Sequence, residues 1–380
     1  MPLLLPVFSP NFIMYTLGLA SHVESMFTKS AEDSSPTIAA IVPAFNEEKS
    51  LAKTLESLLQ QTRRLSQVIV VDDGSTDRTS EVARKFKDVK VLRNPKTMGK
   101  AKSLNRALDL VNTELVMIID ADTVLEKNFA ERAAKAFVDE GIAAASGFVV
   151  PSTGSANTAL RKARVVEDLY AQTTLKRGQS MANGLFVISG CCAVFRTSVL
   201  KRLRFSADTV TEDLDLTWAL EEGGHRTALI EAYTHTLEPK DLTGYVSQIR
   251  RWYMGFFQCL AKHGSRIFSS KPLTLSLALI LTECLVFTLF WAAAIGFLIA
   301  APLLSGELAI LRGFVLTMLG VDLFTVCFPA ALKAHGVGVL KSFLSGLPVY
   351  YALRIVNAFV WWTTFVEWLF GLGATWEKTR

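Results

Sequence analysis

The segment QVIVVDDGSTD, residues 67–77, decides the fold that we expect for this chain. Four β-branched residues in a row, at positions 68–71, are followed by Asp72, Asp73 and Gly74. A short apolar run that stops at an Asp-Gly turn is typical of a strand buried on both faces of a parallel sheet. The two aspartates then lie at the carboxyl end of that strand.

Similar runs recur along the chain and alternate with helical patterns. The apolar runs cover residues 37–42, 89–92, 114–119, 142–150, 185–195 and 227–231. The helical patterns cover residues 51–59, 100–111, 155–180 and 216–222. This alternation predicts an α/β fold, a mostly parallel sheet with helices on both faces. Ligands bind beyond the carboxyl ends of the strands in such sheets, so the polar residues at those ends should meet in one crevice.

Composition separates the chain into a polar part and an apolar tail. Half of the 380 residues are hydrophobic and the mean hydropathy is +0.31, yet few charged residues lie from residue 273 onward. The net charge is only +5 and no block is rich in Lys or Arg, so we expect no nucleic-acid partner. The five cysteines show no zinc-ligand spacing and no disulfide framework, which fits a reducing compartment.

These patterns divide the chain into four parts. Residues 1–36 are an apolar, interfacial segment and a linker. Residues 37–247 form the water-exposed α/β domain. Residues 248–272 are expected to form an amphipathic helix at the membrane surface, since aromatic and basic side chains are combined there. Residues 273–380 are expected to hold about three transmembrane helices.

The apolar tail predicts an integral membrane protein. Its first two runs, residues 273–304 and 308–332, exceed the roughly 20 residues that span a bilayer. The third, residues 343–372, is either one tilted helix or an interfacial piece followed by a span. Lys333 and Lys341 lie between the second and third runs. Because cytosolic loops are enriched in Lys and Arg, we expect this loop and the α/β domain on the cytosolic side of the plasma (inner) membrane.

Asp120 and Asp122 follow the apolar run at residues 114–119 and lie two residues apart. This spacing places both carboxylates on one side of an extended chain. Carboxylate oxygens suit Mg²⁺ or Mn²⁺, which bind through few protein ligands and the phosphates of a substrate. A solvated acidic loop is the plainer interpretation of an isolated Asp-x-Asp pair.

Two other strand ends carry polar residues that suit a nucleotide. Asp72 and Asp73 are placed to accept hydrogen bonds from a base or a ribose, although Asp-Gly is also a common turn. The opposite wall would be formed by residues 43–48, with Pro43, Asn46 and Glu48.

Lys100 opens a predicted helix directly after Gly99. A lysine ammonium and the free amides of a helix N-terminus together suit a phosphate. The alternative interpretation is a solvated basic face of that helix.

The acids of Thr211-Glu212-Asp213 precede another predicted helix. An N-terminal cap has the same appearance, and this is the structural alternative. The functional hypothesis makes Asp213 a general base, because a sugar hydroxyl that attacks an anomeric carbon must lose its proton. Glu212 need not have the same role.

Gln248, Arg251 and Trp252 share one helical face, since they are spaced i, i+3 and i+4. Arginine can bind a diphosphate with two hydrogen bonds. Tryptophan offers a flat apolar surface to a sugar ring. An interfacial helix of aromatic and basic residues is the alternative.

Together these motifs resemble glycosyltransferase family 2. The resemblance is to the membrane-bound branch of cellulose, chitin, hyaluronan and poly-N-acetylglucosamine synthases, and it covers residues 37–260. The motifs occur in the order FNEE at 45–48, VDDGS at 71–75, DAD at 120–122, TED at 211–213 and QIRRW at 248–252. The resemblance implies a GT-A fold. It also implies an inverting transfer from a nucleotide sugar, a UDP-sugar first of all, to a β-linked polysaccharide or oligosaccharide.

The resemblance also assigns residues by motif. Asp213 would be the catalytic base, and Asp120 and Asp122 would hold the diphosphate through Mg²⁺ or Mn²⁺. The donor would be bound by Pro43, Asn46, Glu48, Asp72, Asp73, Lys100, Asp120, Asp122, Gln248, Arg251 and Trp252. The segment 189–193 resembles an acceptor-facing, Gly-rich strand, although its cysteines depart from the usual small residues. The acceptor would therefore meet Gly190, Cys191, Cys192, Glu212 and Trp252.

These motifs support three hypotheses about function. The first is synthesis of a polysaccharide at the membrane, with a glycan acceptor. The second is a single transfer to a lipid acceptor. It is favoured because the chain has fewer expected membrane helices than polymer-secreting relatives, so a channel for a polymer would require a homo-oligomer. The third is a non-enzymatic scaffold that binds nucleotide sugars, and the intact acids at every motif argue against it.

Overall fold

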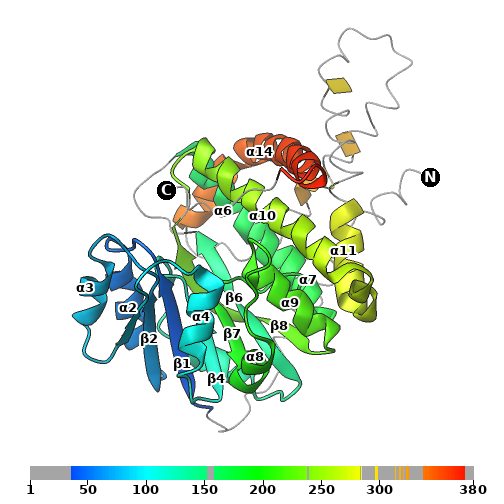
Figure 1. Ribbon diagram of the computed structural model, residues 1–380. Helices are drawn as coiled ribbons and strands as arrows, with labels where there is room; N and C mark the ends of the chain where they lie inside the picture. Colours follow the sequence, from blue (N-terminus) through cyan, green and yellow to red (C-terminus); the bar gives the residue numbers. More distant parts are fainter. Residues whose placement is uncertain are drawn as a thin grey trace.

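The computed structural model describes residues 36–151, 158–237, 239–282 and 337–372, together with isolated positions between residues 284 and 324. The predicted N-terminal segment and most of the first two apolar runs of the tail lie outside the described residues. An eight-stranded sheet in the order β3-β2-β1-β4-β7-β6-β8-β5 forms the centre of the described part (Figure 1).

The strands alternate with helices along most of the chain, as the sequence predicts. The strands are β1 (Ile38–Ala44), β2 (Gln67–Asp72), β3 (Lys90–Arg93), β4 (Leu115–Ile118), β5 (Val124–Leu125), β6 (Ile142–Pro151), β7 (Ala193–Arg196) and β8 (Arg226–Thr236). The first helices are α2 (Leu51–Leu59), α3 (Thr79–Arg84), α4 (Lys100–Leu108), α5 (Phe129–Ala136), α6 (Ala159–Tyr170), α7 (Arg177–Met181) and α8 (Thr197–Leu203). The later helices are α9 (Glu212–Glu222), α10 (Leu242–His263), α11 (Lys271–Thr282) and α14 (Val337–Leu369).

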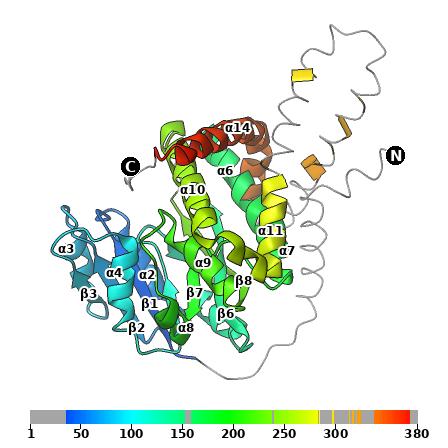
Figure 2. The ribbon, with the colours of Figure 1, turned by 45° about the vertical axis from the view of Figure 1, so that its right-hand side comes forward.

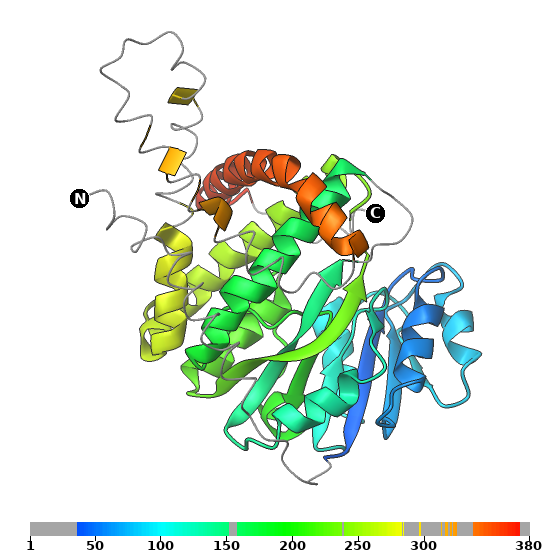
Figure 3. The same ribbon diagram turned by 180° about the vertical axis from the view of Figure 1, so that it is seen from behind.

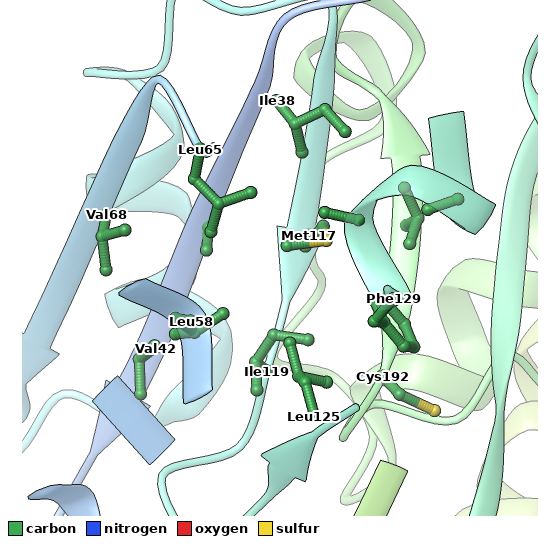
Figure 4. Close-up of a cluster of buried hydrophobic side chains, with 14 of the residues drawn as sticks. Ile38, Val42, Leu58, Leu65, Val68, Met117, Ile119, Leu125, Phe129 and Cys192 are labelled. Atoms are coloured by element: carbon green, nitrogen blue, oxygen red, sulfur yellow. The ribbon is translucent and has the colours of Figure 1, made fainter. Parts of the chain in front are cut away.

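The first half of the sheet is parallel, and its strands β1, β2 and β4 are buried. β1 lies between β2 and β4 and pairs in parallel with both, and β3 pairs in parallel with β2. Side chains alternate along β1, so that Ala40 and Val42 pack under α2, α3 and α5, whereas Ala39 and Ile41 pack under α4, α8 and α9. Figure 4 shows the first of these clusters. The predicted mostly parallel sheet with helices on both faces is confirmed.

The second half of the sheet contains an antiparallel strand. β7 pairs antiparallel with both β4 and β6, while β6 and β8 are parallel. Because β7 runs against its neighbours, the residues that precede it lie at the edge where β1, β2 and β4 end. This places the segment 189–192 beside the acidic clusters.

The prediction of a strand over residues 185–195 is wrong for most of its length, since β7 covers only Ala193–Arg196. Before β7, most backbone-amide hydrogen bonds of this segment go to side chains instead of a neighbouring strand. Leu185 N donates to Thr227 Oγ1 and Ile188 N donates to Thr217 Oγ1 at 3.0 Å. The segment is thus a loop with buried apolar side chains.

The helical prediction for residues 155–180 is confirmed over the described residues, with one addition. A π-helical turn, η2 (Ala171–Lys176), lies between α6 and α7. Such turns insert an extra residue into the helix and are frequent at functional sites.

The last described helix, α14, packs on helices of the α/β domain. A membrane crossing by the third apolar run stays a prediction, and most of that run forms α14, one continuous helix that contains Pro348. It packs across α6 and α10, where Tyr245 Oη donates to Asn357 Oδ1 at 2.8 Å and Arg250 pairs with Glu367 at 2.8 Å (Figures 2 and 3). Among the described residues one helix, Val339–Leu369, is long and apolar enough to cross a membrane, by length and composition alone.

Phe129 on α5 tests the packing of this sheet, because its side chain is fully buried. Phe129→Ala should lower the free energy of unfolding by about 3–5 kcal/mol. Phe268→Ala is the matched control, since Phe268 is 71% exposed, and it should change the stability little. Denaturant unfolding of the two variants compares them, and equal losses would contradict the assignment of the core.

Candidate active site

The carboxyl ends of β1, β2 and β4 lie side by side and carry the polar clusters. Asp73 N donates to Ala44 O at 2.9 Å, which joins the end of β2 to the end of β1. β4 pairs with β1 on its other side and leads through Ile119 into Asp120. The convergence that the sequence predicts for these clusters is therefore present.

Asp73 is held entirely by groups of the protein. Its two carboxylate oxygens accept hydrogen bonds of 2.7–2.9 Å from side chains and amides of one loop and the start of α4, namely Asn94, Thr97, Met98, Gly99 and Ser103. Burial works to raise the pKa of the Asp73 carboxyl, but these bonds outweigh it and hold the pKa below its ordinary value. Asp73 thus fixes the loop before Lys100, and a contact of its carboxylate with a nucleoside stays a prediction.

Gly74 permits this loop to come close to the end of β2. Its φ of +75° lies in the left-handed region, and a Cβ there would lie 2.7 Å from the backbone of Lys96 and Thr97. The Asp72 side chain is fully buried, and its Oδ1 accepts from Ser75 N at 2.9 Å. Its Oδ2 lies 3.5 Å from Arg93 Nε. The Asp-Gly turn is therefore both local structure and one wall of the site.

The segment after β1 forms the facing wall. Asn46 adopts a left-handed backbone conformation and its Oδ1 accepts from Thr76 N at 2.9 Å. Glu48 binds Arg78, while Pro43 lies within β1 opposite Val71. These residues lie beside the Asp72 turn, as predicted, and their contacts with a donor stay predictions.

Lys100 joins the acidic clusters to one another. Its ammonium lies 2.8 Å from Asp120 Oδ1 and 2.9 Å from Glu212 Oε1. Burial works to lower the pKa of Lys100, but the charges of Asp120, Glu212 and Asp213 outweigh it and raise the pKa. Groups from α4, the end of β4 and the start of α9 thus meet at one point (Figure 1).

Glu212 and Asp213 are adjacent but have different environments. Burial works to raise the pKa of Glu212, but the nearby Lys100 outweighs it and the pKa lies below its ordinary value. Burial, and then the charge of Glu212, raise the pKa of Asp213. One acid is therefore a counter-charge to Lys100, whereas the other is the better proton acceptor.

The helix that carries these acids begins earlier than predicted. α9 starts at Glu212 and not at residue 216, so both acids lie in its first turn, where the helix dipole favours negative charge. Thr211 occupies the N-cap position, but its hydroxyl makes no capping hydrogen bond.

The predicted acceptor segment lies against Asp213. Gly190 N donates to Asp213 Oδ2 at 3.1 Å. Cys191 is half-buried and Cys192 is fully buried, with their sulfurs 3.9 Å apart as free thiols. Cys192 Sγ lies 3.4 Å from Gly147 O, so it packs into the sheet. Gly190 and Cys191 are the members of this segment that lie nearest the acids.

α10 is packed tightly against the start of α9. Thr211 occupies the space where a Cβ on Gly255 would lie, so only glycine permits this approach. Arg251 is close enough to Glu212 to favour its ionised form. Gln248 Oε1 is buried and has no hydrogen-bond partner among the described residues, and a bound hydroxyl would satisfy it. Trp252 is 40% exposed and its ring lies 5.9 Å from the guanidinium of Arg164.

Asp120 and Asp122 offer hard oxygen donors in a partly open position. The described residues contain no group of three or more His, Cys, Asp or Glu that could hold a metal ion by itself. This arrangement fits an ion such as Mg²⁺ or Mn²⁺, which keeps part of its coordination for water and substrate phosphates.

Sequence reasoning missed two buried cations near the site. Arg164 on α6 binds Glu167 and Asp168 and lies over Tyr245 and Trp252. Lys176, at the end of η2, donates to Ser146 and Ser189. Both lie in the segment 155–180, where the polar helical pattern gave no sign of which charges face inward.

Comparison with known proteins identifies the family. The family model described as "Glycosyl transferase family 2" matches residues 39–204. The uncharacterized glycosyltransferase YaiP of Escherichia coli (strain K12) is 32% identical over 68% of this chain and 66% of its own length. The chain belongs to glycosyltransferase family 2.

Other relatives of this family 2 glycosyltransferase are named for polymer synthesis. The poly-beta-1,6-N-acetyl-D-glucosamine synthase of Staphylococcus epidermidis (strain ATCC 35984) is 28% identical over 66% of this chain and 62% of its own length. The chain thus spans slightly less than two thirds of these relatives. The family match ends before α9 and α10, so it does not include Asp213 or Arg251.

A solved structure confirms the fold of this family 2 glycosyltransferase. The mannosyltransferase PcManGT from Pyrobaculum calidifontis, in complex with GDP-Man and Mn²⁺, is similar with a TM-score of 0.56. It is 22% identical, and the similarity covers 89% of this chain and 99% of the other. The predicted GT-A fold is confirmed.

Lys100 gives a direct test of the site. Lys100→Met leaves Asp120 and Glu212 without their cation, so an anionic donor would meet uncompensated negative charge. Loss of one charged contact is worth about 1.5–3 kcal/mol, and we expect donor affinity to fall about 10- to 100-fold by calorimetry. Lys102→Met, on an exposed face of the same helix, should bind as the wild type does. Unchanged affinity of Lys100→Met would contradict this role.

Proposed function

We propose that this chain transfers a sugar from a nucleotide sugar to a growing β-linked polysaccharide or oligosaccharide at a membrane, with inversion at the anomeric carbon. The observation that carries the proposal is the position of Lys100, which joins Asp120 to Glu212 beside Asp213. The acids expected to bind the donor and the acid expected to activate the acceptor are thereby within one site.

Asp213 is the proposed general base. Its raised pKa and its place beside Gly190 suit a group that accepts a proton from an acceptor hydroxyl. The hydroxyl oxygen forms a bond to the anomeric carbon as the bond from that carbon to the nucleoside diphosphate breaks. The proton stays on Asp213, and the diphosphate leaves from the opposite face of the sugar.

The donor is proposed to lie along the carboxyl ends of β1, β2 and β4. Asp72, the turn around Asp73 and the segment with Pro43, Asn46 and Glu48 would surround the nucleoside, and a UDP-sugar is the first candidate. Asp120 and Asp122 would hold a divalent ion. Such an ion neutralises charge on the departing diphosphate. Lys100 and Arg251 would add to this neutralisation from α4 and α10.

The acceptor is proposed to lie between Gly190, Cys191 and Trp252. The exposed Trp252 ring offers an apolar surface to a sugar ring. Gln248 Oε1 has no hydrogen-bond partner among the described residues and can accept a hydrogen bond from a sugar hydroxyl. The relatives named as poly-N-acetylglucosamine synthases support polymer extension. The apolar α14 supports a position at the membrane.

Product analysis tests this proposal. The protein, purified in lipid, is incubated with radiolabelled UDP-sugars and Mn²⁺, and the products are sized by mass spectrometry. A ladder of β-linked sugars is expected. A single sugar on a lipid would favour the alternative acceptor, and donor binding without any transfer would overturn the proposal.

Asp213→Asn keeps the size of the side chain and removes its basicity. The rate of transfer should fall by about 10²–10⁴-fold, while donor affinity stays close to that of the wild type. Asp208→Asn is the control, because that carboxylate is 73% exposed and precedes α9. Transfer by Asp213→Asn at half the wild-type rate or more would exclude this residue as the base.

The pH dependence of transfer gives a second test of Asp213. The base must be ionised, so activity is present above its pKa and is lost as the pH falls through it. Because burial and Glu212 raise that pKa, the acidic limb of kcat/KM should lie above the value of about 4 that is usual for aspartate. A profile flat down to about pH 4 would contradict the assignment.

A further inference from the structure

Lys176 is a buried cation that has no part in the proposed mechanism. Only 7% of the residue is exposed, which is rare for lysine. It ends the π-helical turn η2, where Gln172, Thr173 and Thr174 are buried as well. Burying an ammonium is costly unless hydrogen bonds compensate for the lost water.

The ammonium of Lys176 is held by two hydroxyls from different elements. It donates to Ser146 Oγ on β6 at 3.3 Å and to Ser189 Oγ in the loop before β7. Ser189 N also donates to Ser146 Oγ, at 3.2 Å. These three residues form one closed polar cluster directly behind the acceptor segment.

The cluster fixes the loop that contacts Asp213. Ser189 is followed by Gly190, whose N–H donates to Asp213 Oδ2 at 3.1 Å. Cys192 N donates to Ser189 O at 3.1 Å, so the same residue closes the turn. A displacement of Ser189 therefore moves the amide that orients the carboxylate.

We infer that Lys176 is a positioning residue for transfer: it clamps Ser189 to Ser146 and so aligns Gly190 and Asp213 with the acceptor hydroxyl. This inference rests on the proposed function of Asp213. Burial lowers the pKa of Lys176, and the nearby Cys192, Cys191 and Asp213 offset this only in part, so the side chain lies within electrostatic reach of the proposed base. The ammonium itself does not touch the reacting atoms.

Two substitutions test the clamp from both sides. Lys176→Met keeps the length of the side chain and removes its donors, and a misplaced base should lower kcat by about 10²-fold. Ser189→Ala removes one hydroxyl and should lower kcat by about 10-fold. The donor KM should stay near its wild-type value in both, because the proposed donor residues lie at the ends of β1, β2 and β4 and on α4 and α10, and the hydrogen bonds of Lys176 go to Ser146 and Ser189 instead.

A double-mutant cycle separates positioning from general destabilisation. The double variant should be no slower than Lys176→Met alone, since both substitutions break the same clamp. Lys135→Met, an exposed lysine on α5, should match the wild type. If Lys176→Met does not fold, Ser189→Ala alone decides.

The outcomes distinguish this inference from the function on which it rests. Wild-type protein without transfer would overturn the proposed function. If the wild type is active, two results would overturn the inference and leave the function intact. One is an unchanged kcat in Ser189→Ala or in folded Lys176→Met. The other is a rise in the donor KM with no fall in kcat.

Discussion

The attraction between one ammonium and the surrounding carboxylates is the interaction on which this site depends. Asp120 is far along the chain from the adjacent Glu212 and Asp213, and the three carboxylates would repel one another at close range. Lys100 lies among them and makes their approach favourable. Burial and the charge of Glu212 raise the pKa of Asp213, whereas the contact with Lys100 outweighs burial at Glu212 and lowers its pKa, so the two adjacent acids acquire opposite pKa shifts. The proposed division between counter-charge and base follows from these opposite shifts.

The sheet brings these groups together through the direction of its strands. The parallel strands β2 and β4 carry Asp72 and Asp120 to the site at their carboxyl ends. The antiparallel β7 runs the other way, so its amino end brings Gly190 to the same edge. α9 and α10 then complete the site from the side, with Gly255 allowing α10 to touch Thr211. A mixed sheet thus joins the proposed donor residues to the proposed acceptor residues.

Much of the fold could be predicted from the sequence because its central strands are buried on both faces. Such strands are continuous apolar runs, and each ends at a polar turn, as at Asp72 and Asp120. The segment before β7 was misjudged because its apolar side chains are buried while its amides bond to hydroxyls of Thr217 and Thr227. Apolar patterns report burial, and they do not report which partner satisfies the backbone.

The sequence indicated which residues lie close together at the candidate site, but it did not indicate the contacts that each of them makes. Charge and spacing indicated Asp73, but only the structure gives its five internal hydrogen bonds. Lys176 was missed because a polar helix does not reveal an inward lysine when a π-turn changes its phase.

Two adjacent arginines on α10 connect helix α14 to the acidic residues of the candidate site. Arg250 is tied to Glu367 on α14, and Arg251 acts on Glu212. A sideways shift of α14 would therefore drag the same turn of α10 that tunes the acids. At the proposed membrane position of α14, lipid thickness and lateral pressure would act on this helix and reach the proposed site through Arg250.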